Sequence, residues 1–121
     1  GDGRRKEHLP TGKASSKLGE VIITSSEARM GVAVIMENGR IAGIVTDGDV
    51  RRAMMKYGAR FFDITAGDIM TRTPKMIRAT DRLTDAEQLM QDNKIHSLIV
   101  TNENGDLAGI VELYDLMRSG K

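Results

Sequence analysis

The sequence contains no cysteine and no tryptophan, and it has only two prolines. The absence of cysteine excludes disulfides, thiol nucleophiles and cysteine-ligated zinc, and it fits a reducing compartment. Aromatic residues make up 3% of the protein, too few for a platform on which single-stranded nucleic acid stacks. The longest apolar run, residues 30–36, is far shorter than the ~20 residues of a membrane helix. The first residues do not have the pattern of a signal peptide, and we expect no membrane attachment.

Charge of either sign is also not in excess. The protein has 18 basic and 17 acidic residues, a net charge of +1, so its overall field does not attract nucleic acid or an anionic membrane. With 121 residues, 40% of them hydrophobic, it has the size and composition of one ordinary domain or of two very small ones sharing a core. A disordered polymer and a coiled coil are excluded.

Motifs of the common catalytic sites are missing. The sequence has no Ser-His-Asp order, no zinc-protease motif, no Walker A loop and no dinucleotide-binding glycine pattern. Asp47-Gly48-Asp49 is similar to the start of a calcium loop but lacks the later ligands and the glycine at position six. His8 and His96 are the only histidines and lie far apart. We therefore expect this chain to be no enzyme by itself and to hold no metal and no resident cofactor.

The most informative feature is an internal repeat. Residues 34–52 match residues 100–118 at an offset of 66, and ten of these nineteen positions are identical. Two copies of about 60 residues predict a pair of similar units related by a pseudo-twofold axis, because each copy alone is too small to bury a core well.

Each copy shows the same order of segments. Apolar runs flanking a Glu-Asn-Gly turn signal predict buried hairpin strands over 32–35, 41–45, 98–100 and 107–111. Apolar residues at helical spacing, or a polar opening after a strand, predict helices over 18–28, 49–55, 83–93 and 115–117. We expect Asp81 to cap the third of these helices and 75–79 to be extended after Pro74. The stretch 11–16 is too polar for a strand, and we expect it to be irregular.

These segments predict an α/β fold made of two β-α-β-β-α repeats packed as a pseudo-twofold pair. Residues 1–8 are expected to be disordered, 9–56 to form the first repeat with a weak first strand, 57–67 to be a linker, and 68–120 to form the second repeat. Phe61, Phe62 and Ile64 are expected to anchor the linker against the core.

The repeat and its motifs resemble a tandem pair of CBS domains, also called a Bateman module. The matching residues are the β-turn-β followed by Gly43-Ile-Val-Thr-Asp-Gly-Asp49, and the Asp68-Ile-Met-Thr71 and Thr73-Pro74 opening of the second copy. A narrower resemblance rests on the heptapeptide Thr46-Asp-Gly-Asp-Val-Arg-Arg52, with His8-Leu-Pro10 and the end of the sequence from Tyr114. It is similar to the regulatory C-terminal region of bacterial arabinose-5-phosphate isomerases, in which a sugar-isomerase (SIS) domain precedes the CBS pair.

The resemblance implies a nucleotide site at Thr46 and Asp49, in which the Thr hydroxyl contacts phosphate or ribose and the Asp accepts from ribose hydroxyls. The same pattern is also a helix-capping box, and both interpretations can hold at once. In the second copy Glu112 replaces Thr46 while Asp115 remains. A carboxylate repels phosphate, so we expect at most one good site, in the first copy.

Further candidate ligand contacts surround this motif. Arg51 and Arg52, with Asp47 beside them, can grip phosphate, or the arginines can be solvated and pair with Asp47 or Asp49. Gly31 and its counterpart His96 begin equivalent strands, where CBS pairs line their cleft. His96 can contact a base or sense pH, or be a merely half-buried polar residue. Arg72, Thr73 and Lys75 flank Pro74 and can face phosphate or lie in a solvated loop.

Taken together, the sequence predicts a regulatory module of a sugar isomerase of Kdo, lipopolysaccharide or capsule biosynthesis in the bacterial cytoplasm. Its effector would be a nucleotide or nucleotide sugar, with CMP-Kdo as one candidate. An adenine-nucleotide sensor, a ligand-free oligomerisation module and a parent of another kind, such as a nucleotidyltransferase or transporter, are the alternatives. The family resemblance also implies a homodimer, a tetramer in the whole isomerase, and no nucleic-acid or membrane partner.

Overall fold

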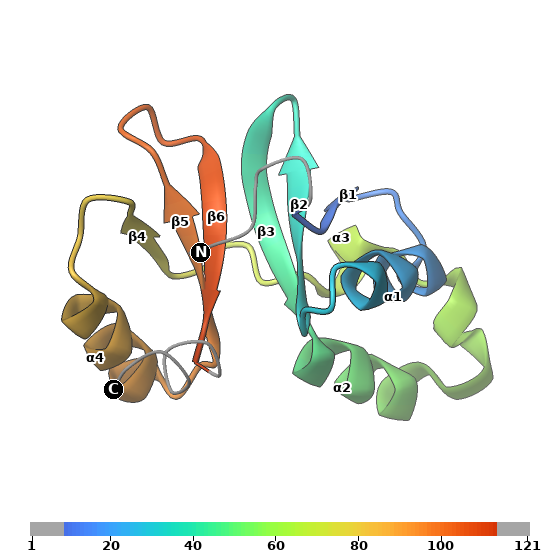
Figure 1. Ribbon diagram of the computed structural model, residues 1–121. Coiled ribbons are helices and arrows are strands. Elements are labelled where there is room, and N and C mark those ends of the chain that lie inside the picture. Colours follow the sequence, from blue (N-terminus) through green and yellow to red (C-terminus); the bar gives the residue numbers. More distant parts are fainter. Residues whose placement is uncertain (1–8, 114–121) are drawn as a thin grey trace. The chain divides into compact units, whose positions relative to one another are not determined.

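The computed structural model describes residues 9–113 (Figure 1). These residues divide into two compact units, Leu9–Thr73 and a second unit from Pro74 onwards. Each unit holds a three-stranded sheet and at least one helix, which confirms the α/β class. Among the described residues, none of the helices has both the length and the apolar composition needed to cross a membrane.

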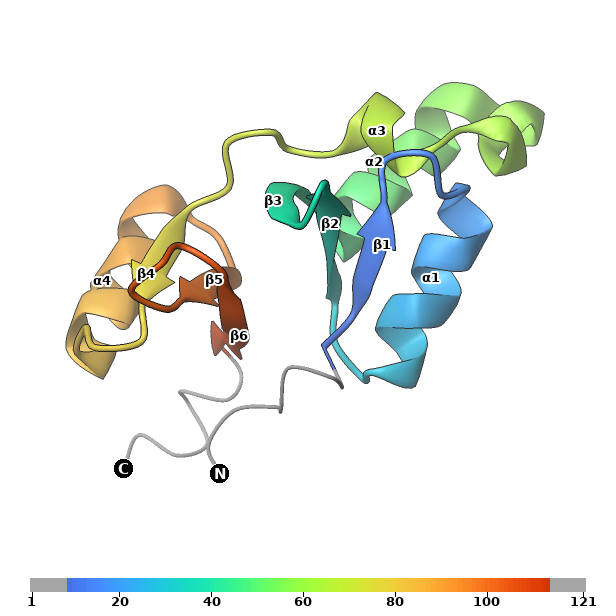
Figure 2. The same cartoon turned by 90° about the horizontal axis from the view of Figure 1, so that it is seen from above.

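The first unit consists of a three-stranded mixed sheet and the helices that pack with it. In sequence order its elements are β1 (Thr11–Lys13), α1 (Leu18–Glu27), β2 (Val32–Glu37), β3 (Arg40–Thr46), α2 (Asp47–Tyr57), the 3-10 helix η2 (Gly58–Asp63) and α3 (Ala66–Ile69). The strand order is β1-β2-β3; β1 runs parallel to β2, and β3 runs antiparallel to it. α1 connects the two parallel strands and lies alongside them (Figure 2).

Two of the sequence-based boundaries in this unit are wrong. Residues 11–13 are not irregular, because they pair with Val34–Met36 through the backbone, and Val34 donates to the Pro10 carbonyl at 2.8 Å. A polar edge strand needs only its backbone to pair, so the composition of its side chains hides it. The helix expected over 49–55 is longer at both ends, since α2 runs from Asp47, directly after the capping residue Thr46, to Tyr57.

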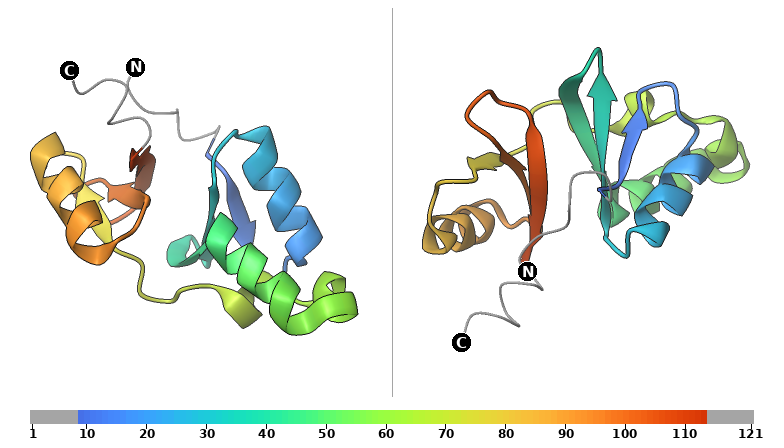
Figure 3. Two further views of the ribbon diagram at one scale, coloured as in Figure 1. Left: turned by 90° about the horizontal axis from the view of Figure 1, so that it is seen from below. Right: turned by 45° about the horizontal axis from the view of Figure 1, so that its top comes forward.

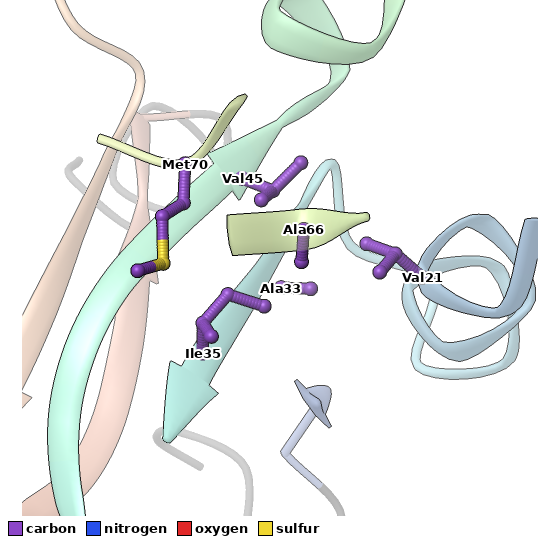
Figure 4. Packing of buried hydrophobic residues seen from close by; sticks show 6 residues of the cluster. All are labelled: Val21, Ala33, Ile35, Val45, Ala66 and Met70. Atoms are coloured by element: carbon purple, nitrogen blue, oxygen red, sulfur yellow. The ribbon is translucent and has the colours of Figure 1, made fainter. Parts of the chain in front are cut away.

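The core of the first unit forms where α1, α3 and the sheet meet. Figure 4 shows Val21 of α1 and Ala66 of α3 approaching Ala33 and Ile35 of β2, with Val45 of β3 and Met70 beside them. Residues 32–35 are all buried, which explains why β2 is a continuous apolar run in the sequence instead of an alternating one.

The segment after α2 is part of this unit. Phe61 and Ile64 pack with Leu18 of α1 and Ala53 of α2, as expected for anchoring residues. The expectation for Phe62 is wrong: 67% of this residue is exposed, and its ring stands edge-on to that of Phe61. One side of a tight 3-10 turn faces the core, so neighbouring residues point in different directions.

The second unit repeats the arrangement with β4 (Met76–Arg78), α4 (Leu83–Asn93), β5 (Ser97–Thr101) and β6 (Leu107–Glu112). β4 runs parallel to β5, and β6 antiparallel to it. α4 lies along one face of this sheet (Figure 3), where Ala86 and Met90 pack on Ile77 and Leu98. The helix expected over 115–117 lies outside the described residues.

α4 has the predicted bounds but not the predicted cap. Arg82 is the N-cap residue, and its side chain makes no capping hydrogen bond. Asp81 Oδ2 instead accepts from the backbone amide of Arg78 at 2.8 Å, which holds the turn after β4. An acidic residue just before a helix can serve either the helix or the preceding turn, and here the turn competes successfully.

The two hairpins differ in length although both contain Asn-Gly. Gly43 pairs with Ile35, whereas Gly109 pairs with Val100. Equivalent residues of β3 and β6 thus differ by 109 − 43 = 66 in number. Equivalent residues of β2 and β5 differ by 100 − 35 = 65. The second hairpin loop therefore contains one additional residue, which an ungapped alignment of the repeats does not reveal.

Candidate ligand-binding site

The strand-to-helix junction of the first unit forms a reciprocal capping box. β3 ends at Thr46 and α2 begins at the next residue. The Asp49 amide donates to Thr46 Oγ1 at 3.1 Å, and the Thr46 amide donates to Asp49 Oδ2 at 2.9 Å. This geometry confirms the capping interpretation, and it fixes both side chains at the positive end of the helix.

Arg52 completes this cluster one helical turn later. Its Nη2 lies 2.7 Å from Asp49 Oδ1, so the ion pair considered from the sequence forms with Asp49. The Asp49 side chain is only 14% exposed, whereas that of Arg52 is 71% exposed. Arg52 therefore presents most of its side chain to solvent while its Nη2 stays paired with Asp49 at the helix start.

The Thr46 hydroxyl at this junction remains available to a ligand as a donor. Thr46 Oγ1 uses a lone pair for the Asp49 amide and keeps its own proton to donate. The Asp47 amide donates to the Gly31 carbonyl at 3.0 Å, which brings those two predicted residues together. A Cβ on Gly48 would lie 3.2 Å from Arg52 Nη1, so the absence of a side chain lets the guanidinium approach the first turn.

Other predicted site residues are not part of this cluster. Arg72 donates to the Gly67 carbonyl at 3.1 Å, which directs its side chain toward α3. Outside the hydrogen-bonded group lie Arg51, Thr73 and Lys75, and all three are exposed, which fits solvated residues.

The second unit reproduces the backbone of the junction but not its side chains. The His96 carbonyl accepts from the Leu113 amide at 2.8 Å, just as the Gly31 carbonyl accepts from Asp47. Glu112 pairs with Ser97 as Thr46 pairs with Val32, so Glu112 occupies the threonine position. His96 is exposed, and Asp115 lies outside the described residues.

A second capping box, at Thr65 and Asp68, was not recognised from the sequence. The Thr65 amide and hydroxyl both donate to Asp68 Oδ2 at 3.0 Å. These two hydrogen bonds hold the pKa of Asp68 below its ordinary value. The Thr-x-x-Asp spacing that marked Thr46 recurs here and was the available signal. In this case it forms the start of the short helix α3.

Two structural features concern other kinds of site. An open surface depression with a volume of about 360 Å³ lies between β4 and α4, lined by Met76, Ile77, Asp81, Asp85, Gln88, Leu89 and Asp92. None of these is a predicted site residue. Within residues 9–113, no three His, Asp or Glu side chains gather in a way that could hold a metal ion.

The family model described as "CBS domain" matches this chain twice, over residues 7–56 and 66–120. The chain belongs to the CBS domain family. The resemblance drawn from the repeat and from the motif around Thr46 is thereby confirmed.

Curated relatives of the CBS pair include arabinose 5-phosphate isomerases. The chain is 43% identical over 104 residues to a probable arabinose 5-phosphate isomerase of Haemophilus influenzae, covering 86% of the chain and 31% of the relative. It is 33% identical over 115 residues to an arabinose 5-phosphate isomerase of Pseudomonas aeruginosa, covering 94% and 35%. The CBS pair thus spans about a third of the length of these relatives.

Solved structures support the same fold. A CBS-domain protein of Agrobacterium tumefaciens superposes with a TM-score of 0.86 at 23% identity, covering 93% of this chain and 90% of that one. A CBS domain protein of Pyrobaculum aerophilum, complexed with AMP, superposes with a TM-score of 0.80 at 26% identity, covering 89% and 82%.

Proposed function

We propose that this CBS pair is a regulatory module that binds a nucleotide or nucleotide sugar at the start of α2. The observation that carries the proposal is the Thr46, Asp49 and Arg52 cluster, in which two hydrogen bonds and an ion pair hold the side chains in place. A preorganised cluster at a helix N-terminus favours a phosphate, because the positive end of the helix dipole points toward it.

Each member of the cluster has a chemical role toward such a ligand. The Thr46 hydroxyl donates to a phosphate or ribose oxygen, and the exposed guanidinium of Arg52 adds a charged donor. The Asp49 carboxylate uses two of its roughly four acceptor positions within the cluster, leaving capacity for a ribose hydroxyl. Gly31, Asp47 and Arg51 are the neighbours proposed to complete the site.

The second junction is proposed to bind phosphate less well. Glu112 places a carboxylate where the first unit has a hydroxyl, and like charges repel. Arg72, Thr73, Lys75, His96 and Asp115 remain proposed ligand contacts.

The relatives suggest what the module regulates. We propose that it belongs to a bacterial arabinose-5-phosphate isomerase and acts in the cytoplasm, where ligand binding would bias the attached isomerase domain through different affinities for two arrangements. CMP-Kdo, a downstream activated sugar, offers phosphate, ribose and carboxylate to the cluster. AMP is the second candidate, since a structural relative is complexed with it.

The test measures the melting temperature of the protein with AMP, ADP, ATP, CMP, CMP-Kdo and arabinose 5-phosphate. A ligand that binds only the folded state stabilises it by about 2.7 kcal/mol at a hundredfold excess over Kd. We expect one of the nucleotides to raise the melting temperature of the native protein and to lose this effect in Thr46→Val.

Thr65→Val is the matched control. Both substitutions remove a capping threonine in the same unit, each at a cost of about 1 kcal/mol, but only Thr46 belongs to the proposed site. Equal loss of the ligand-induced shift in both variants, or retention of it in Thr46→Val, would contradict the assignment of the site.

A second candidate function rests on exposed apolar side chains in the first unit. Ile23, Met54, Met55 and Phe62 are all more than half exposed, and Met55 reaches 84%. An oligomerisation module would bury such residues against a partner, and we propose a homodimer as that state. A dimer that shows no thermal shift with any of the compounds would favour this function over ligand sensing.

A further inference from the structure

The two hairpin turns contain the same tripeptide in different backbone conformations. Glu37-Asn38-Gly39 and Glu103-Asn104-Gly105 share their sequence and are all exposed. Each asparagine follows a glutamate and precedes a glycine. A difference between the two asparagines therefore does not come from these neighbours in the sequence.

The first turn leaves a glycine amide free. Asn38 and Gly39 have φ angles of +53° and +78°, which correspond to a two-residue type I′ turn, and Glu37 pairs with Arg40 to close it. Among the hydrogen bonds of residues 9–113, the Gly39 amide takes part in none. The backbone nitrogen of Gly39, the residue after Asn38, is therefore open to solvent.

The second turn holds the corresponding amide. Gly105 donates to the Asn102 carbonyl at 3.0 Å. Asn102 Oδ1 accepts from the amides of Asn104 and Asp106, at 2.9 and 3.0 Å. A further bond joins the Asn102 amide to the Asp106 carbonyl at 2.9 Å. These four bonds restrain the backbone on both sides of Asn104.

We propose that Asn38 is a site of spontaneous deamidation in the folded protein and that Asn104 is protected from it. The Gly39 peptide nitrogen loses its proton to solvent base and attacks Cγ of Asn38. A bond forms between Cγ and that nitrogen, the bond between Cγ and Nδ2 breaks, and ammonia leaves. Water then opens the succinimide at either carbonyl, giving aspartate or isoaspartate.

The position of Asn38 makes this reaction consequential. Isoaspartate inserts a methylene into the backbone of a turn that has only two residues, and either product adds a negative charge beside Glu37. The turn sets the register between β2 and β3, and β3 ends at Thr46 of the proposed ligand site. We therefore expect the modified protein to melt at a lower temperature.

The experiment incubates the folded protein at mildly alkaline pH and follows both peptides by mass spectrometry with separation of isoaspartate. We expect Asn38 to be converted several-fold faster than Asn104. In urea, where both turns are lost, the two rates should become equal. Asn38→Gly keeps a turn that tolerates positive φ, and its melting temperature should stay constant over the incubation while that of the native protein falls.

Equal rates in the folded protein, or faster conversion of Asn104, would overturn the proposal. A rate difference that persists in urea would overturn it as well, because the cause would then be Arg40 or Asp106 after the turn, not the hydrogen bonding of the glycine amides. Ligand binding at Thr46 is not part of this readout, so the result is independent of the proposed function.

Discussion

Gly43 and Gly109 occupy equivalent positions of the two repeats, but a side chain would meet different surroundings at each. Both follow alanine in the segment Ala-Gly-Ile-Val. A Cβ on Gly43 would lie 2.6 Å from the Thr71 carbonyl oxygen and 2.9 Å from Met70 Sδ. On Gly109 the nearest atom is Val100 Cβ at 3.9 Å, an ordinary contact. In the first unit a returning segment passes this position, where Thr71 and Ile44 exchange backbone hydrogen bonds at 2.9 and 3.0 Å.

At the residue scale, we expect Gly43→Ala to lower the free energy of unfolding by about 1–3 kcal/mol, the usual cost of overpacking. The new methyl group meets backbone, which cannot move without breaking the pair between Ile44 and Thr71. Gly109→Ala is the matched control and should change stability by less than about 0.5 kcal/mol. Urea unfolding of both variants measures the difference. Equal losses of unfolding free energy in the two variants would show that the close approach of Thr71 is not the reason why position 43 requires glycine.

α2 is an element with a glycine at each end, and the two glycines have opposite effects. Gly48 lies in the first turn with a helical backbone, and a Cβ there would meet only the end of the flexible Arg52 side chain. Gly58, the C-cap, has φ +54° and ψ −127°, and a Cβ added to it would have no atom within 4 Å. Crowding therefore plays no part at Gly58, where the backbone conformation alone calls for glycine.

At the element scale, the same substitution should thus have opposite signs at the two ends of α2. Gly58→Ala is expected to lower the free energy of unfolding by about 1–3 kcal/mol, the cost of holding a residue with a Cβ in that region. Gly48→Ala should raise it by up to about 1 kcal/mol through helix propensity. Thermal unfolding of the two variants provides the comparison. Destabilisation by Gly48→Ala would indicate that the ion pair between Asp49 and Arg52 needs the space that a Cβ on Gly48 would occupy.

At the scale of the whole molecule, the first unit extends beyond the first sequence repeat. Phe61, Ile64, Ala66 and Met70 all lie after the expected end of the repeat, yet they are buried in the two clusters that hold α1, α2 and the sheet together. The Leu18 amide donates to the Ile64 carbonyl at 3.0 Å, so the backbone joins these segments too. Residues 57–73 therefore complete the first unit.

This arrangement predicts which fragment folds. We expect a fragment of residues 9–73 to unfold cooperatively on heating and a fragment of residues 9–56 to show no cooperative transition. The shorter fragment loses the apolar residues that cover Leu18 and Ala33, and a polypeptide of this size has no surplus of buried area. Circular dichroism during heating tests both. A cooperative transition in the shorter fragment would refute the structural role given to 57–73.

Local patterns in the sequence were enough to predict the repeat, the family, the α/β class and the order of most elements. Apolar runs specify strands, and helical spacing specifies helices such as α4, whose bounds were predicted correctly. The pairing of Thr46 with Asp49 was also predicted, because a capping box is formed by residues three apart.

Features that depend on residues distant in sequence could be read only from the folded molecule. The strand β1 exists through backbone bonds to β2, which leave no trace in side chains. Phe61 is buried and Phe62 exposed because of where η2 meets α1. Identical Ala-Gly-Ile-Val segments acquire different roles in the two repeats, because Thr71 approaches Gly43 in the first unit while the contact of Gly109 is an ordinary one. Local patterning thus specifies elements, whereas packing between distant segments specifies what each residue does.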